Sequence, residues 1–249
     1  MTVRRIGLAR ALSKLGYCSR SQATQLIREG RVALNAKVTR NPEAPVREGK
    51  DRITVDGVLV AVAGRVYLML NKPRGIVTTA SDEKGRDTVY SLLPADLPWV
   101  APVGRLDKAS EGLLLLTNDS EWAAQITAPE SHVPKTYHVQ VGAVAGEDLL
   151  RKILAGVRAG SEHLRVREAT VLRGGSKNTW LEIVLDEGRN RQIRRIFEAL
   201  GIEVLRLVRV SVGPLQLGSL AKGKWRHLTD AEKDAMDKAF QPAPSLAKK

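Results

Sequence analysis

Residues 103–119 read Val-Gly-Arg-Leu-Asp-Lys-Ala-Ser-Glu-Gly-Leu-Leu-Leu-Leu-Thr-Asn-Asp, with a four-leucine run between two groups of turn-forming residues. A short, continuous apolar run of this kind is typical of a fully buried strand. The polar segment before it, with Asp107 at its centre, would then be held at the edge of a rigid sheet, where binding and catalytic residues are often placed. The alternative is that Asp107 only caps a short turn, which is the commoner use of an aspartate. The choice between a catalytic Asp107 and a turn-capping Asp107 depends on the residues elsewhere in the chain.

The composition narrows the class of protein. The chain has 249 residues, of which 43% are hydrophobic, enough for a packed core, and it contains no apolar run of about 18 residues that could span a membrane. Its first residues lack the apolar stretch of a secretory signal. Cys18 is the single cysteine, and the four histidines show no metal-ligand spacing. We therefore expect a cytoplasmic protein without a metal or a disulfide framework.

The charge is strongly positive and unevenly distributed. The formal net charge is +13 and the pI is near 10.1. Residues 1–60 hold twelve Lys and Arg against five Asp and Glu, and nine of the twelve are arginine. The planar arginine fork suits phosphate groups better than a lysine ammonium does. We therefore expect this segment to bind nucleic acid rather than only to improve solubility, with Arg20, Arg28 and Arg31 as candidate phosphate contacts.

The same segment has the pattern of a small module of two helices and a sheet. Leucine and alanine residues at helical spacing over residues 8–15 predict a first helix that ends at Gly16. Ser19 and Gln22 have the spacing of a capping box, and they predict a second helix that ends at Gly30. Short strands are expected at residues 32–34, 37–38 and 53–55.

This module resembles the small RNA-binding domain named after ribosomal small-subunit protein four, over about residues 4–60. One position departs from that pattern, because the turn that usually reads Asn-Gly is Asn35-Ala36 here. A type I′ turn would force Ala36 to a positive φ angle, so we expect a different turn geometry at this point.

After a brief linker at residues 61–65, strands are expected at residues 66–70, 135–141, 179–185 and 203–212, with a helix from Ser120 to Ile126. Strands with few helices between them predict an α+β domain on a mainly antiparallel sheet. The glycine-rich motifs that bind nucleotide phosphates are absent from the sequence.

A second informative stretch, residues 187–201, predicts a basic helix. Its apolar residues lie on one face, and Gly201 is a natural end. At about 100° per residue, Arg191 and Arg195 point away from that face, where they could bind phosphate, whereas Arg194 lies at its border and could turn toward a carboxylate. By itself the pattern also fits an ordinary solvated helix.

Several motifs in order resemble those of the pseudouridine synthases. Gly104-Arg105-Leu106-Asp107 with Ser110-x-Gly112 resembles the catalytic motif. The stretches 70–75 (Leu-Asn-Lys-Pro-Arg-Gly), 135–137 (Lys-Thr-Tyr) and 187–195 resemble further motifs of the branch that modifies ribosomal RNA, which often carries the N-terminal domain seen here. The resemblance covers about residues 4–230. It implies a small N-terminal RNA-binding domain and a larger α+β catalytic domain, on a mainly antiparallel sheet with a central cleft.

The resemblance also implies roles for individual residues. Asp107 corresponds to the catalytic aspartate, Arg194 to the cation that keeps it ionised, and Tyr137 to the tyrosine that stacks on the target base. Because the reaction is an isomerisation, no cofactor is implied. Whether Asp107 attacks the ribose or promotes a glycal-type intermediate stays open.

Contacts with the RNA follow from the same resemblance. The target base must leave its stack, and Arg105 corresponds to a residue that fills the vacated space or holds a neighbouring phosphate. Leu207 or Leu205 is expected to cover the other face of the base. The remaining candidates for lining the groove are Lys135, Arg189, Asn190, Arg191 and Gln192.

The sequence thus predicts an RNA-binding domain at residues 1–60, a linker at 61–65, a catalytic domain at 66–235 and a disordered basic tail at 236–249. We expect a monomer whose partner is structured ribosomal RNA, free or in an assembling ribosomal subunit, with no membrane contact. A non-enzymatic RNA-binding assembly factor with the same fold is the main alternative. A DNA-binding regulator that uses the helix pair at Ser19–Gly30 is a weaker one, because it leaves everything after residue 66 unexplained.

Overall fold

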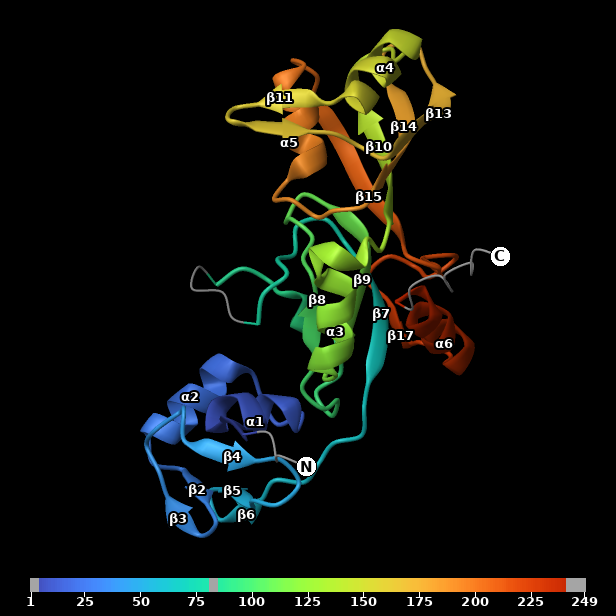
Figure 1. Ribbon diagram of the computed structural model, residues 1–249. Coiled ribbons are helices and arrows are strands. Elements are labelled where there is room, and N and C mark those ends of the chain that lie inside the picture. The colour runs from blue at the N-terminus through green and yellow to red at the C-terminus, as the bar shows by residue number, and fades with distance from the viewer. Residues whose placement is uncertain (1–4, 81–84, 241–249) are drawn as a thin grey trace, which may run out of the picture.

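The structure, a computed structural model, describes residues 5–80 and 85–240 of the chain. Figure 1 shows a small N-terminal domain beside one end of a long, twisted sheet that carries the rest of the protein. The elements of the N-terminal domain are β1 (Arg5–Gly7), α1 (Leu8–Lys14), α2 (Arg20–Arg28), β2 (Val32–Leu34), β3 (Lys37–Val38), β4 (Pro45–Arg47), β5 (Ile53–Val55) and β6 (Val58–Leu59).

The two predicted helices of the N-terminal domain are confirmed, and so is the capping box. The backbone N–H of Gln22 donates to Ser19 Oγ at 3.1 Å, and the backbone N–H of Ser19 donates to Gln22 Oε1 at 3.0 Å. Leu8, Leu12 and Ile27 are completely buried and form the centre of this domain's core. The domain therefore has its own hydrophobic core.

The predicted geometry of the turn at residues 35–36 is wrong. Asn35 and Ala36 have φ angles of 50° and 66°, so both residues of the β2–β3 turn are left-handed, as a type I′ turn requires. The side chain of Asn35 holds this turn, because it donates to Asp51 Oδ1 at 3.1 Å and accepts from the backbone N–H of Arg52 at 3.0 Å. These contacts outweigh the strain of a Cβ atom at position 36.

Within the described residues, nine strands form one mixed sheet, and most of the strand pairs are antiparallel. The α+β prediction is therefore confirmed. The main path through the sheet follows the order β13-β14-β10-β15-β9-β7-β17, with β8 on β9 and β16 on β15. The bounds are β7 (Tyr67–Lys72), β8 (Ala101–Val103), β9 (Glu111–Thr117), β10 (Lys135–Val141), β13 (Glu168–Gly174), β14 (Thr179–Leu185), β15 (Val204–Val212), β16 (Leu215–Gln216) and β17 (Trp225–His227).

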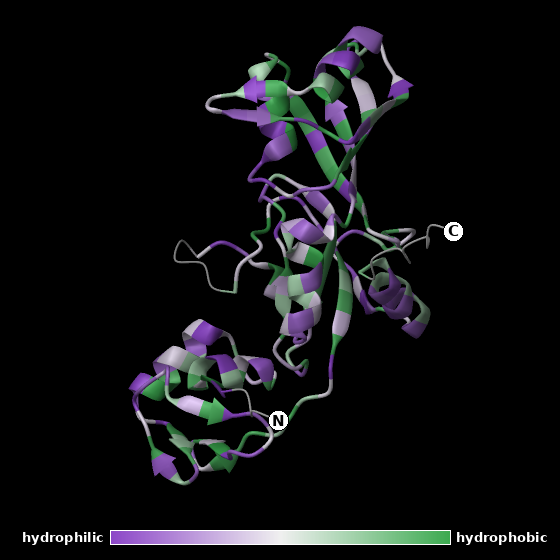
Figure 2. Ribbon diagram, viewed as in Figure 1, coloured by the Kyte–Doolittle hydropathy of each residue, from purple (hydrophilic) through white to green (hydrophobic). Residues whose placement is uncertain are grey.

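Strand β9 confirms the prediction made from the leucine run, since every one of its residues is buried. It pairs antiparallel with β7 and β8 and parallel with β15, where Gly112 faces Arg209. Hydrophobic residues concentrate along these central strands (Figure 2). The end of β9 that follows Asp107 is thus fixed by a rigid core.

Helices and a hairpin pack around this sheet. Helix α3 packs near β8, and α5 near the β11–β12 hairpin (Figure 1). The bounds are α3 (Ser120–Thr127), α4 (Glu147–Ala155), α5 (Gln192–Ala199), α6 (Asp230–Ala239), β11 (Val157–Ala159), β12 (Glu162–Leu164) and the 3-10 helices η1 (Val89–Leu92) and η2 (Pro129–Ser131). No helix in the described part of the chain is long and apolar enough to cross a membrane.

The expectation of a disordered tail from residue 236 is wrong for its first residues. Helix α6 continues to Ala239, because Met236 is completely buried in the core and Phe240 packs against the same cluster. The remainder of the expected tail, residues 241–249, lies outside the described residues.

The N-terminal domain touches the larger one at the end of α1. The backbone N–H of Trp99 donates to the carbonyl of Gly16 at 2.8 Å, and that of Ala63 donates to the carbonyl of Leu15 at 3.2 Å. Residues 60–66, which connect the domains, form neither helix nor strand. A groove bordered by Arg10, Arg20, Trp99 and Thr127 runs between the two domains.

Candidate active site

Asp107 lies in the loop of residues 104–110 between β8 and β9, at the rim of a pocket. Its side chain is 32% exposed. The loop is tied down by its backbone, because the N–H of Ser110 donates to the carbonyl of Asp107 at 3.0 Å and Thr78 Oγ1 donates to the carbonyl of Leu106 at 2.8 Å. The carboxylate is therefore reachable from solvent on a loop of defined shape.

Lys72, at the end of β7, is a residue whose role the sequence analysis missed. It is completely buried, and its Nζ donates to the carbonyls of Pro73, Asp107 and Ser110 at 3.2, 3.1 and 2.9 Å. Burial lowers the pKa of Lys72 to about 8. The ammonium thus joins both ends of the Asp107 turn to β7. The signal that could have revealed it is a lysine directly after a continuous apolar strand.

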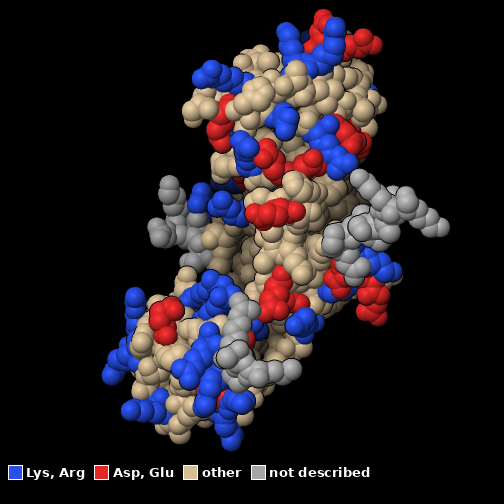
Figure 3. All heavy atoms as spheres, viewed as in Figure 1, with Lys and Arg blue, Asp and Glu red and all other residues tan. Residues whose placement is uncertain are grey.

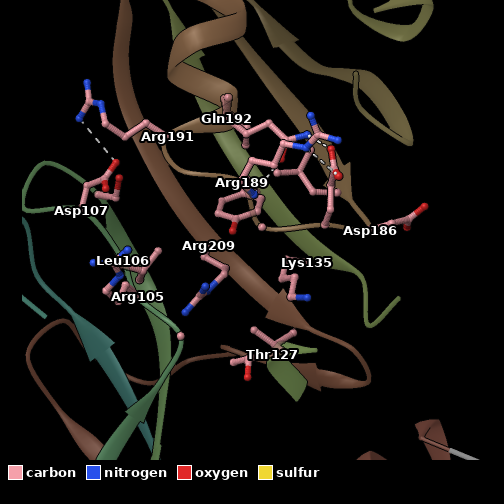
Figure 4. Close-up of a pocket in the computed structure, with 18 of the residues that line it drawn as sticks. Arg105, Leu106, Asp107, Thr127, Lys135, Asp186, Arg189, Arg191, Gln192 and Arg209 are labelled. Carbon is pink, nitrogen blue, oxygen red and sulfur yellow. Dashed lines mark hydrogen bonds and ion pairs between the residues drawn. The ribbon is translucent and has the colours of Figure 1, made fainter. Parts of the chain in front are cut away.

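Two guanidinium groups face the Asp107 carboxylate (Figure 4). Arg191 Nη1 lies 3.6 Å and Arg194 Nε 3.9 Å from Asp107 Oδ2. These distances are too long for hydrogen bonds but short enough for strong attraction. Arg194 is held by its Nη2, which donates to the carbonyl of Ala109 at 3.0 Å. Burial and the charge of Arg191 lower the pKa of Arg194, and Asp107 opposes that change.

The prediction that Arg191 and Arg195 both point away toward phosphate is wrong. Arg191 is not part of the helix: it has a φ angle of 49°, and α5 begins at Gln192. The helical projection therefore does not apply to its side chain, which reaches Asp107 instead. Arg195 does point away from Asp107, but its guanidinium is paired with Glu162.

The loop before α5 is held by its own polar side chains. Gln192 is only 2% exposed, and its amide donates to Glu187 Oε1 at 2.9 Å and to the carbonyl of Arg165 at 3.0 Å. Arg189 pairs with Glu187 at 3.0 Å. Both residues line the pocket, and these contacts also help to fix the shape of the loop before α5. Asn190 is exposed and is not part of the pocket lining among the described residues.

The pocket has a volume of about 530 Å³, within the range of ligand pockets. Tyr137 on β10 and Leu207 on β15 line it, as does the predicted Arg105. Leu205, the alternative to Leu207, does not belong to its described lining and lies near Gly142. Of the two leucines, Leu207 is therefore the one that lines the same pocket as Asp107 and Tyr137.

Two further cations line the pocket, Lys135 on β10 and Arg209 on β15. Burial lowers the pKa of Lys135, and the charge of Arg209 adds to that effect. Arg209 was missed by the sequence analysis. It occupies the same register of β15 as the buried Leu207 and Ser211, so its signal is a charged residue at an inward-facing strand position.

The candidate contacts of the N-terminal domain lie outside this pocket. Arg20 and Arg28 are exposed on α2, and Arg20 borders the groove between the domains. Arg31 is already paired with Asp56 at 2.6 Å and Glu29 at 3.4 Å. Lys and Arg side chains cover much of the visible face of this domain (Figure 3).

The pocket is large enough for a flat polar ring, and an aromatic and an apolar side chain, Tyr137 and Leu207, are among the residues that line it. It also presents an accessible carboxylate beside two guanidinium groups, and a carboxylate can act as a nucleophile. No group of three or more potential metal-binding side chains occurs in residues 5–80 and 85–240.

Comparison with known families agrees with both domains. Residues 66–199 match the family described as RNA pseudouridylate synthase, and residues 6–53 match the S4 domain. The first match covers more than half of the chain and contains Asp107, Tyr137 and Arg194.

Individual proteins are similar over nearly the whole chain. The ribosomal large subunit pseudouridine synthase B of Bacillus subtilis is 38% identical over 227 residues, which cover 90% of this chain and 93% of that protein. An uncharacterized RNA pseudouridine synthase of Aquifex aeolicus is 38% identical over 230 residues, 92% of either chain. A crystal structure of a pseudouridylate synthase superposes with a TM-score of 0.64 at 31% identity, covering 93% of this chain and 99% of the other.

Proposed function

This chain belongs to the RNA pseudouridylate synthase family and carries an N-terminal S4 domain, and from that premise we propose that it converts a specific uridine of ribosomal RNA to pseudouridine with Asp107 as the catalytic carboxylate. The observation that carries the proposal is the position of the Asp107 carboxylate, 3.6 and 3.9 Å from two guanidinium groups at the rim of the pocket that Tyr137 and Leu207 line. The similarity to a large-subunit enzyme of Bacillus subtilis supports ribosomal RNA as the substrate.

The proposed reaction breaks the bond between ribose C1′ and uracil N1, turns the base, and joins C1′ to C5. The proton on C5 is then lost and N1 takes up a proton, so atoms and electrons balance without an oxidant or a reductant. The ionised Asp107 serves either by attack on the ribose or by promoting a glycal-type intermediate. Arg191 and Arg194 attract the carboxylate and orient it toward the pocket in both routes.

The pocket wall orients the base after it has left the RNA stack, a step that costs a few kcal/mol. Tyr137 stacks on one face of the uracil ring, and its hydroxyl helps to remove the C5 proton. Leu207 covers the other face. Arg105, which lines the pocket mouth, fills the space that the base vacates or holds a neighbouring phosphate.

The N-terminal domain, which we assign to residues 1–60, supplies RNA contacts outside the pocket. Its excess of arginine and the exposed positions of Arg20 and Arg28 support contacts with phosphates of folded RNA. The catalytic domain then follows the connection at residues 61–65. We infer that the enzyme acts in the cytoplasm as a monomer, and that its substrate is free ribosomal RNA or an assembling ribosomal subunit.

The experiment that tests this function is chemical mapping of pseudouridine in ribosomal RNA from cells with and without the gene. A single pseudouridine should disappear on deletion, return with the wild-type gene, and stay absent with the Asp107→Asn gene. An unchanged map in the deletion strain would instead support the alternative of a non-enzymatic assembly factor. Return of the modification with Asp107→Asn would show that Asp107 is not the catalytic residue.

A further inference from the structure

Arg209 is a buried cation with unused hydrogen-bond donors. The residue is 6% exposed, and its Nε donates to the carbonyl of Leu113 at 2.7 Å, which fixes the direction of the side chain. Neither Nη atom makes a hydrogen bond or ion pair with any residue in the described part of the chain. Because Arg209 lines the pocket, these nitrogens are the donors left to a bound molecule.

Lys135 is the second cation on this wall. In Figure 4, Lys135 and Arg209 lie beside each other on the side of the pocket away from the Asp107–Arg191 pair. Tyr137, two residues after Lys135, pairs with Arg209 across β10 and β15, so both cations project from adjacent strands of a rigid sheet. Among the described residues, Lys135 Nζ has no hydrogen bond or ion pair.

The positive charges of Lys135 and Arg209 are not balanced by the charges around them. The acid whose charge acts on Lys135 is Asp186, which is already hydrogen-bonded to Arg167 at 3.2 Å. Asp107 faces Arg191 and Arg194. Two neighbouring cations that are largely removed from water are unfavourable unless an anion joins them. Burial and the mutual repulsion of the two charges lower the pKa of Lys135, as expected for a cationic site without its anion.

We propose that Arg209 and Lys135 form an anion site that binds one backbone phosphate of the RNA strand beside the flipped uridine. The proposal rests on the proposed function, since it takes the occupant of the pocket to be an RNA nucleotide. An arginine fork and a lysine point charge together match the geometry and the charge of a phosphodiester. A uracil carbonyl is neutral and would leave both charges unmatched. The site therefore fixes the register of the RNA strand, so that C1′ of the target lies next to Asp107.

The test uses full-length protein with Asp107→Asn, so that binding is measured without turnover. The probes are synthetic RNA fragments that contain the mapped uridine, each with a single neutral methylphosphonate linkage at a different position around it. One linkage should weaken binding about tenfold. In the same background, Lys135→Met should weaken binding of unmodified RNA by less than that linkage does, because Arg209 still holds the phosphate. The variant should also reduce the effect of that one linkage and lower the salt dependence of binding by about one charge.

Two further variants complete the design. Lys177→Met removes an equal charge from the exposed turn between β13 and β14, and it should leave both the affinity and the linkage pattern unchanged. Arg209→Lys keeps the charge and tests the fork without the risk of an unfolded protein. Arg209→Lys should weaken the contact with the phosphate at the same linkage, but it should leave the salt dependence of RNA binding unchanged.

If the effect of Lys135→Met simply adds to the effect of every methylphosphonate linkage, the proposal is overturned. Coupling between Lys135→Met and a linkage distant from the target uridine would overturn it as well. These outcomes are distinct from a failure of the proposed function. If Asp107 were not catalytic, tritium release by the Asp107→Asn enzyme would continue, whereas the coupling between Lys135 and one linkage would still be measurable as binding.

Discussion

The Nζ atom of Lys72 lies 3.1 Å from the backbone carbonyl oxygen of Asp107, so a buried charge on β7 holds the backbone of the candidate catalytic residue. The same ammonium also holds the carbonyl of Ser110, on the far side of the turn. Since β7 and β9 pair along their lengths, the turn is fixed to the most rigid part of the sheet. The position of the carboxylate thus depends on a residue 35 positions earlier in the chain.

Replacement of Lys72 by methionine should therefore impair catalysis more than RNA binding. Methionine fills the space but removes one hydrogen-bond donor from each of three carbonyls, and the carbonyl of Asp107 keeps the N–H of Ser110. Displacement of a catalytic group by about 1 Å can cost about 100-fold in rate. We expect kcat to fall by about 10- to 100-fold and the Kd for RNA to change little. Single-turnover tritium release and filter binding measure the two quantities. An unchanged kcat in the folded variant would show that the turn keeps its shape without Lys72.

Gly112 tests the close approach of β9 and β15. Its φ angle is +102°, and a Cβ at this position would lie 2.8 Å from the backbone nitrogen of Arg209 and closer still to its carbonyl oxygen. Gly112→Ala should therefore destabilise the protein by about 2–4 kcal/mol, through backbone strain and overpacking. Gly174→Ala is the control, because a Cβ there meets nothing within 4 Å and its φ is not positive. Equal urea midpoints for the two variants would contradict the expected clash.

The turn at Ala36 offers a stabilising substitution. Because Ala36 is held at a φ angle of 66°, Ala36→Gly should relieve strain that exceeds the entropy cost of glycine, for a gain of about 0.5–1 kcal/mol. Ala36→Ser keeps the Cβ atom and should give no gain. Thermal unfolding of the full-length variants measures both. A lower Tm for Ala36→Gly than for the wild type would mean that the strain at this turn is negligible.

Glu111 predicts a pH dependence of stability. Burial disfavours its charge, but hydrogen bonds and ion pairs from Arg206 and Lys222 outweigh burial and lower the pKa of Glu111 to about 2 from its usual 4.5. A lowered carboxylate pKa stabilises the fold above the unfolded value and loses that effect as the pH falls. Glu111→Gln should therefore be less stable than the wild type at pH 7 by about 1–3 kcal/mol.

The difference between wild type and Glu111→Gln should shrink as the pH falls from 4.5 toward 2, because the wild-type carboxylate becomes protonated over that interval. Chemical unfolding at a series of pH values measures it. Asp96→Asn, at an exposed carboxylate, serves as the control for a general effect of charge. A difference that stays constant from pH 7 to pH 2 would contradict the assigned pKa.

Local patterns in the sequence predicted the elements that border the pocket. Strands β10 and β14 have the expected bounds of residues 135–141 and 179–185, because alternation and turn residues mark both ends. The capping box at Ser19 fixed the start of α2 in the same way. The β11–β12 hairpin was not predicted, since its two short strands carry little local signal. Helix α4 was also missed, although its apolar residues follow a helical pattern and two acids stand in its first turn.

The composition of the site depended on contacts between distant parts of the chain. Arg191 reaches Asp107 because its own backbone leaves the helical region, which a helical projection cannot show. Lys72 is held by carbonyls near residue 107, and the Nε of Arg209 by the carbonyl of Leu113, so neither burial could be derived from neighbouring residues. Conversely, the family resemblance placed Arg194 beside Asp107, where the structure also has it.

The most direct test of the central claim is tritium release from ribosomal RNA that carries uridine labelled at C5, with wild-type and Asp107→Asn enzymes compared at equal occupancy of the RNA. The substitution keeps the size and polarity of the side chain and removes the charge that faces Arg191 and Arg194. We predict unchanged RNA affinity within a few-fold and no release above background by Asp107→Asn. Release at the wild-type rate by the Asp107→Asn enzyme would contradict the assignment of Asp107 as the catalytic carboxylate.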